Sequence, residues 1–71
     1  MEEKILSIIS EVLECEVTLE TSQQNCETWD SMHHLNMTIA LESEFDIEFE
    51  PEEIADMVNV KTIITVVNSK L

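Results

Sequence analysis

The sequence contains no arginine and no glycine, and it has only three lysines among its 71 residues. Lys4, Lys61 and Lys70 are too few to build the basic face that neutralises nucleic-acid phosphates. Sixteen acidic residues bring the formal net charge to −13, so an anionic membrane surface would repel the chain as well. We therefore expect neither nucleic acid nor a membrane among its partners.

Long apolar runs are also missing. None approaches the ~20 residues that cross a bilayer, and the start MEEKILSII lacks the basic region and cleavage site of a signal peptide. We expect a cytoplasmic, monomeric protein with a single domain over residues 1–71. A hydrophobic fraction of 44% is ordinary for a globular chain, which argues against a disordered acidic tail.

The absence of glycine affects the helix ends. No helix can end on a glycine in the left-handed conformation, so we expect Asn25, Asn59 or Asn68, or side-chain caps, to replace it. Cysteine is scarce too, because only Cys15 and Cys26 are present. One disulfide is too few for a secreted mini-protein, so we interpret both as reduced thiols.

Apolar spacing predicts two long helices separated by a loop. Residues 2–14 and residues 31–45 both show helical spacing, and Asp30 is a suitable N-cap for the second helix. Residues 15–30 are polar and lack a period, so we expect a long ordered loop. Trp29 at its end should pack the loop against the core.

Residues 44–50, EFDIEFE, alternate strictly between polar and apolar, which taken alone indicates a strand. No second strand of similar quality exists to pair with it. We therefore predict the end of the second helix followed by an extended loop with Ile47 and Phe49 turned inward. Pro51 then begins a short helix over residues 51–57.

The last segment, residues 59–71, is rich in β-branched residues, which favour a strand. Asn59 as an N-cap, helical apolar spacing and Lys70 near the end favour a helix, which we choose. The expected fold class is all-α: a small four-helix bundle of three main helices plus a short third helix, with a long first loop. The expected core is Ile5, Ile9, Val12, Met37, Leu41, Phe45, Ile54, Met57, Ile63 and Val67.

Catalytic residue types occur around Ser31, since Asp30 precedes it and His34 follows three residues later. A hydrolase would also need an oxyanion-stabilising loop and a nucleophile turn, and neither motif is present. We predict no catalytic residues.

Metal sites are equally poorly supported. Cys26, His33 and His34 match no common zinc spacing. The alternating acids of residues 44–52 lack the glycine of an EF-hand loop. We predict no specific metal site.

One constellation remains, in which Asp30-Ser31-Met32 stands at the junction of the long loop and the second helix. Downstream, ALESEFDIEF covers residues 40–49. Together with the length and the charge, these segments resemble the acyl carrier protein family, whose motif is Asp-Ser-Leu. The resemblance covers nearly the whole chain.

The resemblance implies a non-catalytic carrier, in lipid or polyketide biosynthesis. In the family, a phosphopantetheinyl transferase moves a 4′-phosphopantetheine arm from coenzyme A to the serine hydroxyl, here Ser31. The arm carries acyl groups as thioesters between partner enzymes. Without the resemblance, Ser31 would be read as a neutral first-turn residue.

The resemblance also implies a docking surface for acyl-loading and acyl-transfer enzymes with basic patches. The positions concerned are Asp30, Met32, His33, Leu35, Asn36, Ile39 and Glu42. His33, Asn36 and Ser43 stand where fatty-acid carriers are commonly acidic, and half of the acids lie in residues 42–56. We therefore expect a specialised pathway. His33 and His34 are expected to be exposed, and they suggest the hypothesis of a pH-responsive docking face.

Two alternatives stay open. A peptidyl or aminoacyl carrier would share the fold, but its Gly-Gly-(His/Asp)-Ser lead-in differs from the sequence of residues 27–31, ETWDS. A small acidic binding or regulatory module that is never modified is the second alternative.

Overall fold

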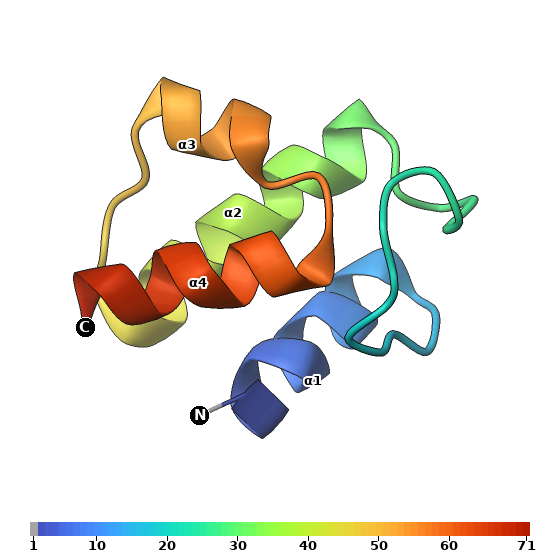
Figure 1. Ribbon diagram of the computed structural model, residues 1–71, viewed down its shortest axis with the longest axis horizontal. Coiled ribbons are helices and arrows are strands. Elements are labelled where there is room, and N and C mark those ends of the chain that lie inside the picture. Colours follow the sequence, from blue (N-terminus) through green and yellow to red (C-terminus); the bar gives the residue numbers. More distant parts are fainter. Residues whose placement is uncertain (1) are drawn as a thin grey trace.

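The computed structural model describes residues 2–71 and contains four helices (Figure 1). They are α1 (Glu2–Leu13), α2 (Ser31–Phe45), α3 (Pro51–Asp56) and α4 (Val60–Lys70). Between residues 2 and 71 there is no strand, only an isolated bridge between Ser22 and Asn59. The predicted all-α bundle with a short third helix and a long first loop is confirmed.

The ends of α1 and α2 are closed by acidic residues instead of asparagine. Glu14, with φ 56°, and Asp46, with φ 54°, adopt the left-handed conformation directly after Leu13 and Phe45. The N–H of Asp46 donates to the carbonyl of Glu42 and so closes α2. The expectation that Asn25, Asn59 or Asn68 would take this role is wrong. A left-handed residue other than glycine costs roughly 1–2 kcal/mol, which the surrounding packing must offset.

The helix starts follow the sequence more closely. The Asn59 side chain accepts the N–H of Thr62 at 2.8 Å, which confirms it as the N-cap of α4. Pro51 is the first residue of α3, as predicted. The Glu53 carboxylate accepts the N–H of Glu50 at 2.8 Å and completes a reciprocal capping box.

The core lies between α1, α2 and α4. Seven of the ten predicted core residues are fully buried: Ile5, Ile9, Met37, Leu41, Met57, Ile63 and Val67. Val12, Phe45 and Ile54 are half-buried and pack against the core, so they belong to its edge and not to its fully buried centre. Leu13, at the end of α1, and Val60 and Ile64 of α4 are buried instead. Phe49 is buried and Ile47 half-buried, which confirms the inward turn after α2.

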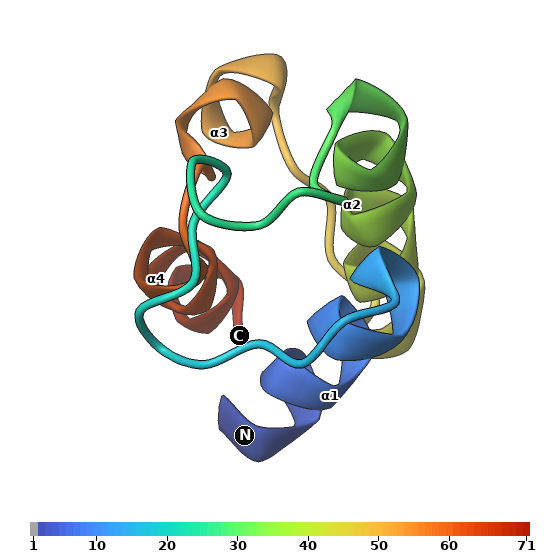
Figure 2. The same cartoon turned by 90° about the vertical axis from the view of Figure 1, so that its right-hand side faces the viewer.

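The long loop, residues 14–30, runs from α1 past α4 and α3 to the start of α2 (Figure 2). Two backbone hydrogen bonds fix its middle to the α3–α4 junction: Gln23 N–H to the Val58 carbonyl at 2.9 Å and Val60 N–H to the Thr21 carbonyl at 3.0 Å. Trp29 is buried in the core at the end of the loop, as predicted. The loop is therefore ordered and sets the position of the α2 start.

No helix within residues 2–71 combines the length and the apolar character that a membrane span requires.

Candidate functional site

Ser31 is the first residue of α2, and it is exposed. Asp30 before it is the N-cap: its Oδ1 accepts the His33 N–H at 2.9 Å, and its carbonyl accepts the His34 N–H at 2.9 Å. Both bonds fix the backbone on either side of Ser31 without using the serine hydroxyl. The hydroxyl is thus presented to solvent on a rigid helix start.

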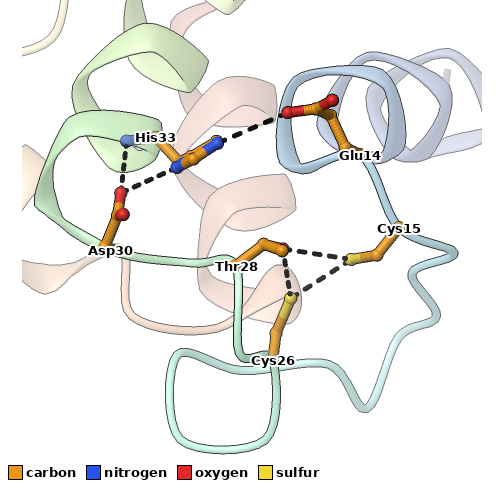
Figure 3. A network of polar contacts seen from close by, with 6 residues as sticks. All are labelled: Glu14, Cys15, Cys26, Thr28, Asp30 and His33. Carbon is orange, nitrogen blue, oxygen red and sulfur yellow. Dashed lines mark hydrogen bonds and ion pairs between the residues drawn. The ribbon is translucent and has the colours of Figure 1, made fainter.

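A chain of polar contacts joins this helix start to the end of α1 (Figure 3). His33 Nδ1 lies 2.7 Å from Asp30 Oδ1, and His33 Nε2 lies 3.7 Å from Glu14 Oε2. The hydrogen bond to Asp30, and then Glu14, raise the pKa of His33. The backbone N–H of His33, followed by its ring, lowers the pKa of Asp30. The His33 ring therefore lies between the carboxylates of Asp30 and Glu14.

His34 is buried and differs from its neighbour in every contact. The Trp29 indole N–H donates to His34 Nδ1 at 2.9 Å, and His34 Nε2 lies 2.8 Å from the Ile54 carbonyl. Since an indole N–H only donates and a carbonyl only accepts, His34 is neutral with its proton on Nε2. The expectation that both histidines are exposed is wrong. His34 is buried, because its position on the inner face of α2 lets it bond Trp29 and Ile54, and His33 is half-buried between Asp30 and Glu14.

The hydrolase and metal arrangements considered from the sequence do not assemble around Ser31. Both ring nitrogens of His34 are engaged away from Ser31, with Trp29 and with Ile54. In the part of the chain that the structure describes, no three His, Cys, Asp or Glu side chains come close enough to hold a metal ion.

The outer face of α2 next to Ser31 is largely apolar. Met32, Leu35 and Ile39 expose 71%, 53% and 61% of their surface, and Asn36 between them is also exposed. We call these four residues the outer face of α2. Four of the seven residues expected at the docking surface therefore lie together, while Asp30 and His33 lie at its edge near Ser31.

Glu42, the remaining expected docking residue, is half-buried and serves the fold. Its Oε2 accepts the N–H of Phe49 at 2.8 Å, and its carbonyl accepts the N–H of Ile47 at 3.1 Å. These bonds hold the segment that follows α2, so Glu42 has a structural role whether or not a partner contacts it.

Two residues of the site escape sequence reasoning. Glu14 reaches His33 from another helix end, and Trp29 holds the inner side of the α2 start through His34. A signal for the second contact exists, because His34 precedes Met37 and Leu41 by three and seven residues and so shares their buried face. Nothing in the sequence indicates the Glu14 contact.

An exposed hydroxyl at a helix start, beside an apolar outer face and on a small acidic helical bundle, is typical of a small carrier protein. The comparisons agree. The chain is 35% identical to the acyl carrier protein of Petrotoga mobilis over 72 aligned positions, covering 97% of this chain and 85% of that protein. The chain belongs to the acyl carrier protein family. No protein-family model matches it.

A solved structure gives the same result for the fold. The solution NMR structure of the holo acyl carrier protein from Geobacter metallireducens superposes with a TM-score of 0.84 at 25% identity. The superposition covers 97% of this chain and 83% of the other. The four helices and the long loop are therefore the family fold.

Proposed function

We propose that Ser31 carries a 4′-phosphopantetheine arm, transferred from coenzyme A by a phosphopantetheinyl transferase, and that the chain is a carrier without catalysis of its own. The observation that carries this proposal is the exposed Ser31 hydroxyl on the fixed start of α2, in a chain of the acyl carrier protein family. The arm supplies a terminal thiol that holds acyl groups as thioesters.

The residues around Ser31 fit a phosphodiester. A phosphate on the serine lies at the N-terminus of α2, where the backbone N–H groups and the helix dipole favour negative charge. Asp30 would repel it, but the Asp30 carboxylate is directed toward the backbone and ring of His33. The raised pKa of His33 extends to higher pH the range in which its protonated ring offsets the charge of Asp30.

Partner enzymes would meet two different surfaces. The outer face of α2 offers an apolar contact directly beside Ser31, and exposed apolar patches of this kind mark protein interfaces. The acids of residues 42–56 attract basic patches and orient them, which raises the encounter rate more than the affinity. Docking therefore combines an apolar contact near the arm with electrostatic steering from the far end of α2.

Three α2 positions without an acidic side chain support a specialised pathway. His33, Asn36 and Ser43 leave α2 less acidic near Ser31 than fatty-acid carriers commonly are. We expect acyl-loading enzymes of fatty-acid synthesis to load the holo chain poorly. The double substitution Asn36→Glu with Ser43→Glu should then raise loading several-fold, and equal loading before and after it would argue against a specialised docking surface.

Modification is tested by incubating the full chain with coenzyme A and a broad-specificity phosphopantetheinyl transferase, followed by intact mass measurement. We expect the mass to rise by one phosphopantetheine. Ser31→Ala should abolish the increase, while Ser43→Ala, an exposed serine on the same helix, should retain it. No increase in the unsubstituted chain would favour an unmodified acidic module instead.

A further inference from the structure

We propose that Cys15 and Cys26 form a redox-active dithiol that exchanges with small cationic or uncharged disulfides and closes a reversible intramolecular disulfide. Cys15 follows α1 and Cys26 lies in the long loop, yet their sulfurs are only 3.2 Å apart (Figure 3). Both are free thiols and both are half-buried. A disulfide has its sulfurs about 2 Å apart, so closure needs an approach of only about 1 Å.

One hydroxyl group contacts both sulfurs, and a pocket gives access to them. Thr28 Oγ1 lies 3.4 Å from the Cys26 sulfur and donates to the Cys15 sulfur at 3.7 Å. A pocket of about 290 Å³ opens beside the sulfurs. It is lined by Cys15, Glu16, Thr21, Asn25, Cys26, Glu27 and Thr28. A small disulfide can therefore reach the pair from solvent.

The two thiols are not equivalent, which sets the order of attack. Burial raises the pKa of Cys26, but hydrogen bonds with Thr28 and Cys15 outweigh it, and the net pKa is lowered. The hydrogen bond to Cys26, followed by burial, raises the pKa of Cys15. Because the thiolate is the nucleophile and Thr28 Oγ1 lies closer to the Cys26 sulfur, at 3.4 Å against 3.7 Å to the Cys15 sulfur, we expect Cys26 to attack first and Cys15 to resolve.

The exchange balances without any further reagent. The Cys26 thiolate attacks one sulfur of the small disulfide, whose S–S bond breaks and expels one thiolate. Cys15 loses its proton to solvent and attacks the Cys26 sulfur of this mixed disulfide, expelling the second thiolate. The protein loses two electrons and two protons, and the small disulfide is reduced to two thiols.

Charge selects among such disulfides. Glu16 and Glu27 line the pocket, and the chain as a whole carries −13. This field repels an anion such as oxidised glutathione and attracts a dication such as cystamine. Added salt should reduce the difference because it screens the field.

Closure would fix the loop that positions the α2 start. The bridge links residues eleven apart, and Cys15 directly follows Glu14, which contacts His33 beside Ser31. A disulfide that closes a loop of this length should raise the melting temperature by about 10 °C, because it restricts the unfolded chain.

The test uses the full chain and Ser31→Ala, which cannot carry an arm thiol. After treatment with cystamine and blocking of the remaining thiols, intact mass should show a monomer that has lost two hydrogen atoms and accepts no blocking group. Dithiothreitol should restore both thiols and reverse the rise in melting temperature. Persistent mixed disulfides or disulfide-linked dimers as the main product would overturn the proposal.

Variants test the order of attack and the charge selection. Cys15→Ser should stop at the mixed disulfide, and Cys26→Ser should react at least several-fold more slowly than Cys15→Ser.

Cystamine should react at least tenfold faster than oxidised glutathione at low salt. Glu16→Gln with Glu27→Gln should reduce this ratio. The control Glu48→Gln, at an exposed acid that does not line the pocket, should change it less. Equal reaction rates for cystamine and oxidised glutathione would contradict the proposed charge selection. These outcomes do not depend on modification of Ser31, so the two proposals can fail separately.

Discussion

The inner and outer faces of α2 do not divide into apolar and polar as on an ordinary surface helix, on which polar residues face solvent. The inner face buries two polar side chains, His34 and Thr38, next to Met37 and Leu41. The outer face exposes Met32, Leu35 and Ile39. Each buried polar group has a partner, since Thr38 donates to the Leu35 carbonyl at 2.8 Å and His34 bonds Trp29 and Ile54.

This difference separates stability from recognition on one helix. The inner face holds α2 to the bundle through apolar packing and through hydrogen bonds that would be costly to leave unmade. The outer face contributes little to folding and stays apolar, which is the character of a contact surface for other proteins. Substitutions on the two faces should therefore have different consequences, and the following predictions test that separation in order of decreasing effect on stability.

The largest effect should come from Leu41→Ala. Leu41 is fully buried, so its truncation loses apolar transfer energy and leaves a cavity, together worth about 2–5 kcal/mol. Urea unfolding followed by circular dichroism measures the free energy of unfolding. Leu35→Ala, the same truncation on the outer face, is the matched control, and an equal loss in both variants would refute the separation.

The next effect should come from His34→Leu. Leucine is similar in size to histidine but cannot accept the N–H of the buried Trp29 indole. Leaving this donor without a partner should lower the free energy of unfolding by about 1–3 kcal/mol. The same unfolding measurement applies. An unchanged or increased stability would mean that His34 is retained for a reason other than this bond.

Leu35→Ala should change the free energy of unfolding by no more than about 0.5 kcal/mol, because the side chain is half exposed. Modification of Ser31 by the transferase should nevertheless slow several-fold. Leu71→Ala, which truncates a leucine of similar exposure at the end of the chain, should leave the modification rate unchanged. Equal rates in both variants would show that the outer face is not the docking surface.

The smallest effect should be the pH dependence of His33. Its pKa is raised in the folded chain, first by Asp30 and then by Glu14. The ordinary pKa is about 6.5, so the stabilisation is complete below that pH and is lost as the pH rises through the higher folded value. The difference in melting temperature between the unsubstituted chain and His33→Gln should therefore shrink from pH 6 to pH 9. A difference that grows with pH would contradict this assignment.

The lowered pKa of Asp30 acts in a separate window. Its contribution is present above the ordinary carboxyl pKa of about 3.9 and is lost as the pH falls through the lower folded value. Protonation of Asp30 therefore does not contribute to the change in the melting-temperature difference between pH 6 and pH 9.

The sequence predicted the helices and the position of Ser31 because these depend on local features. Apolar spacing, the Asp30 and Asn59 caps and Pro51 act within one helical turn, and all of them appear in the structure. The sequence did not predict the left-handed Glu14 and Asp46, since neither residue type prefers that conformation strongly enough to be recognised.

The sequence by itself determined an acidic all-α bundle with an exposed serine after an aspartate cap. Only the tertiary structure decided that His34 accepts the Trp29 indole N–H, that His33 turns toward Glu14, and that Cys15 meets Cys26. The reason is the range of the interactions. A cap or an apolar stripe is satisfied by neighbours three or four residues away, whereas these contacts exist only once the long loop has been folded back onto the ends of α1 and α2.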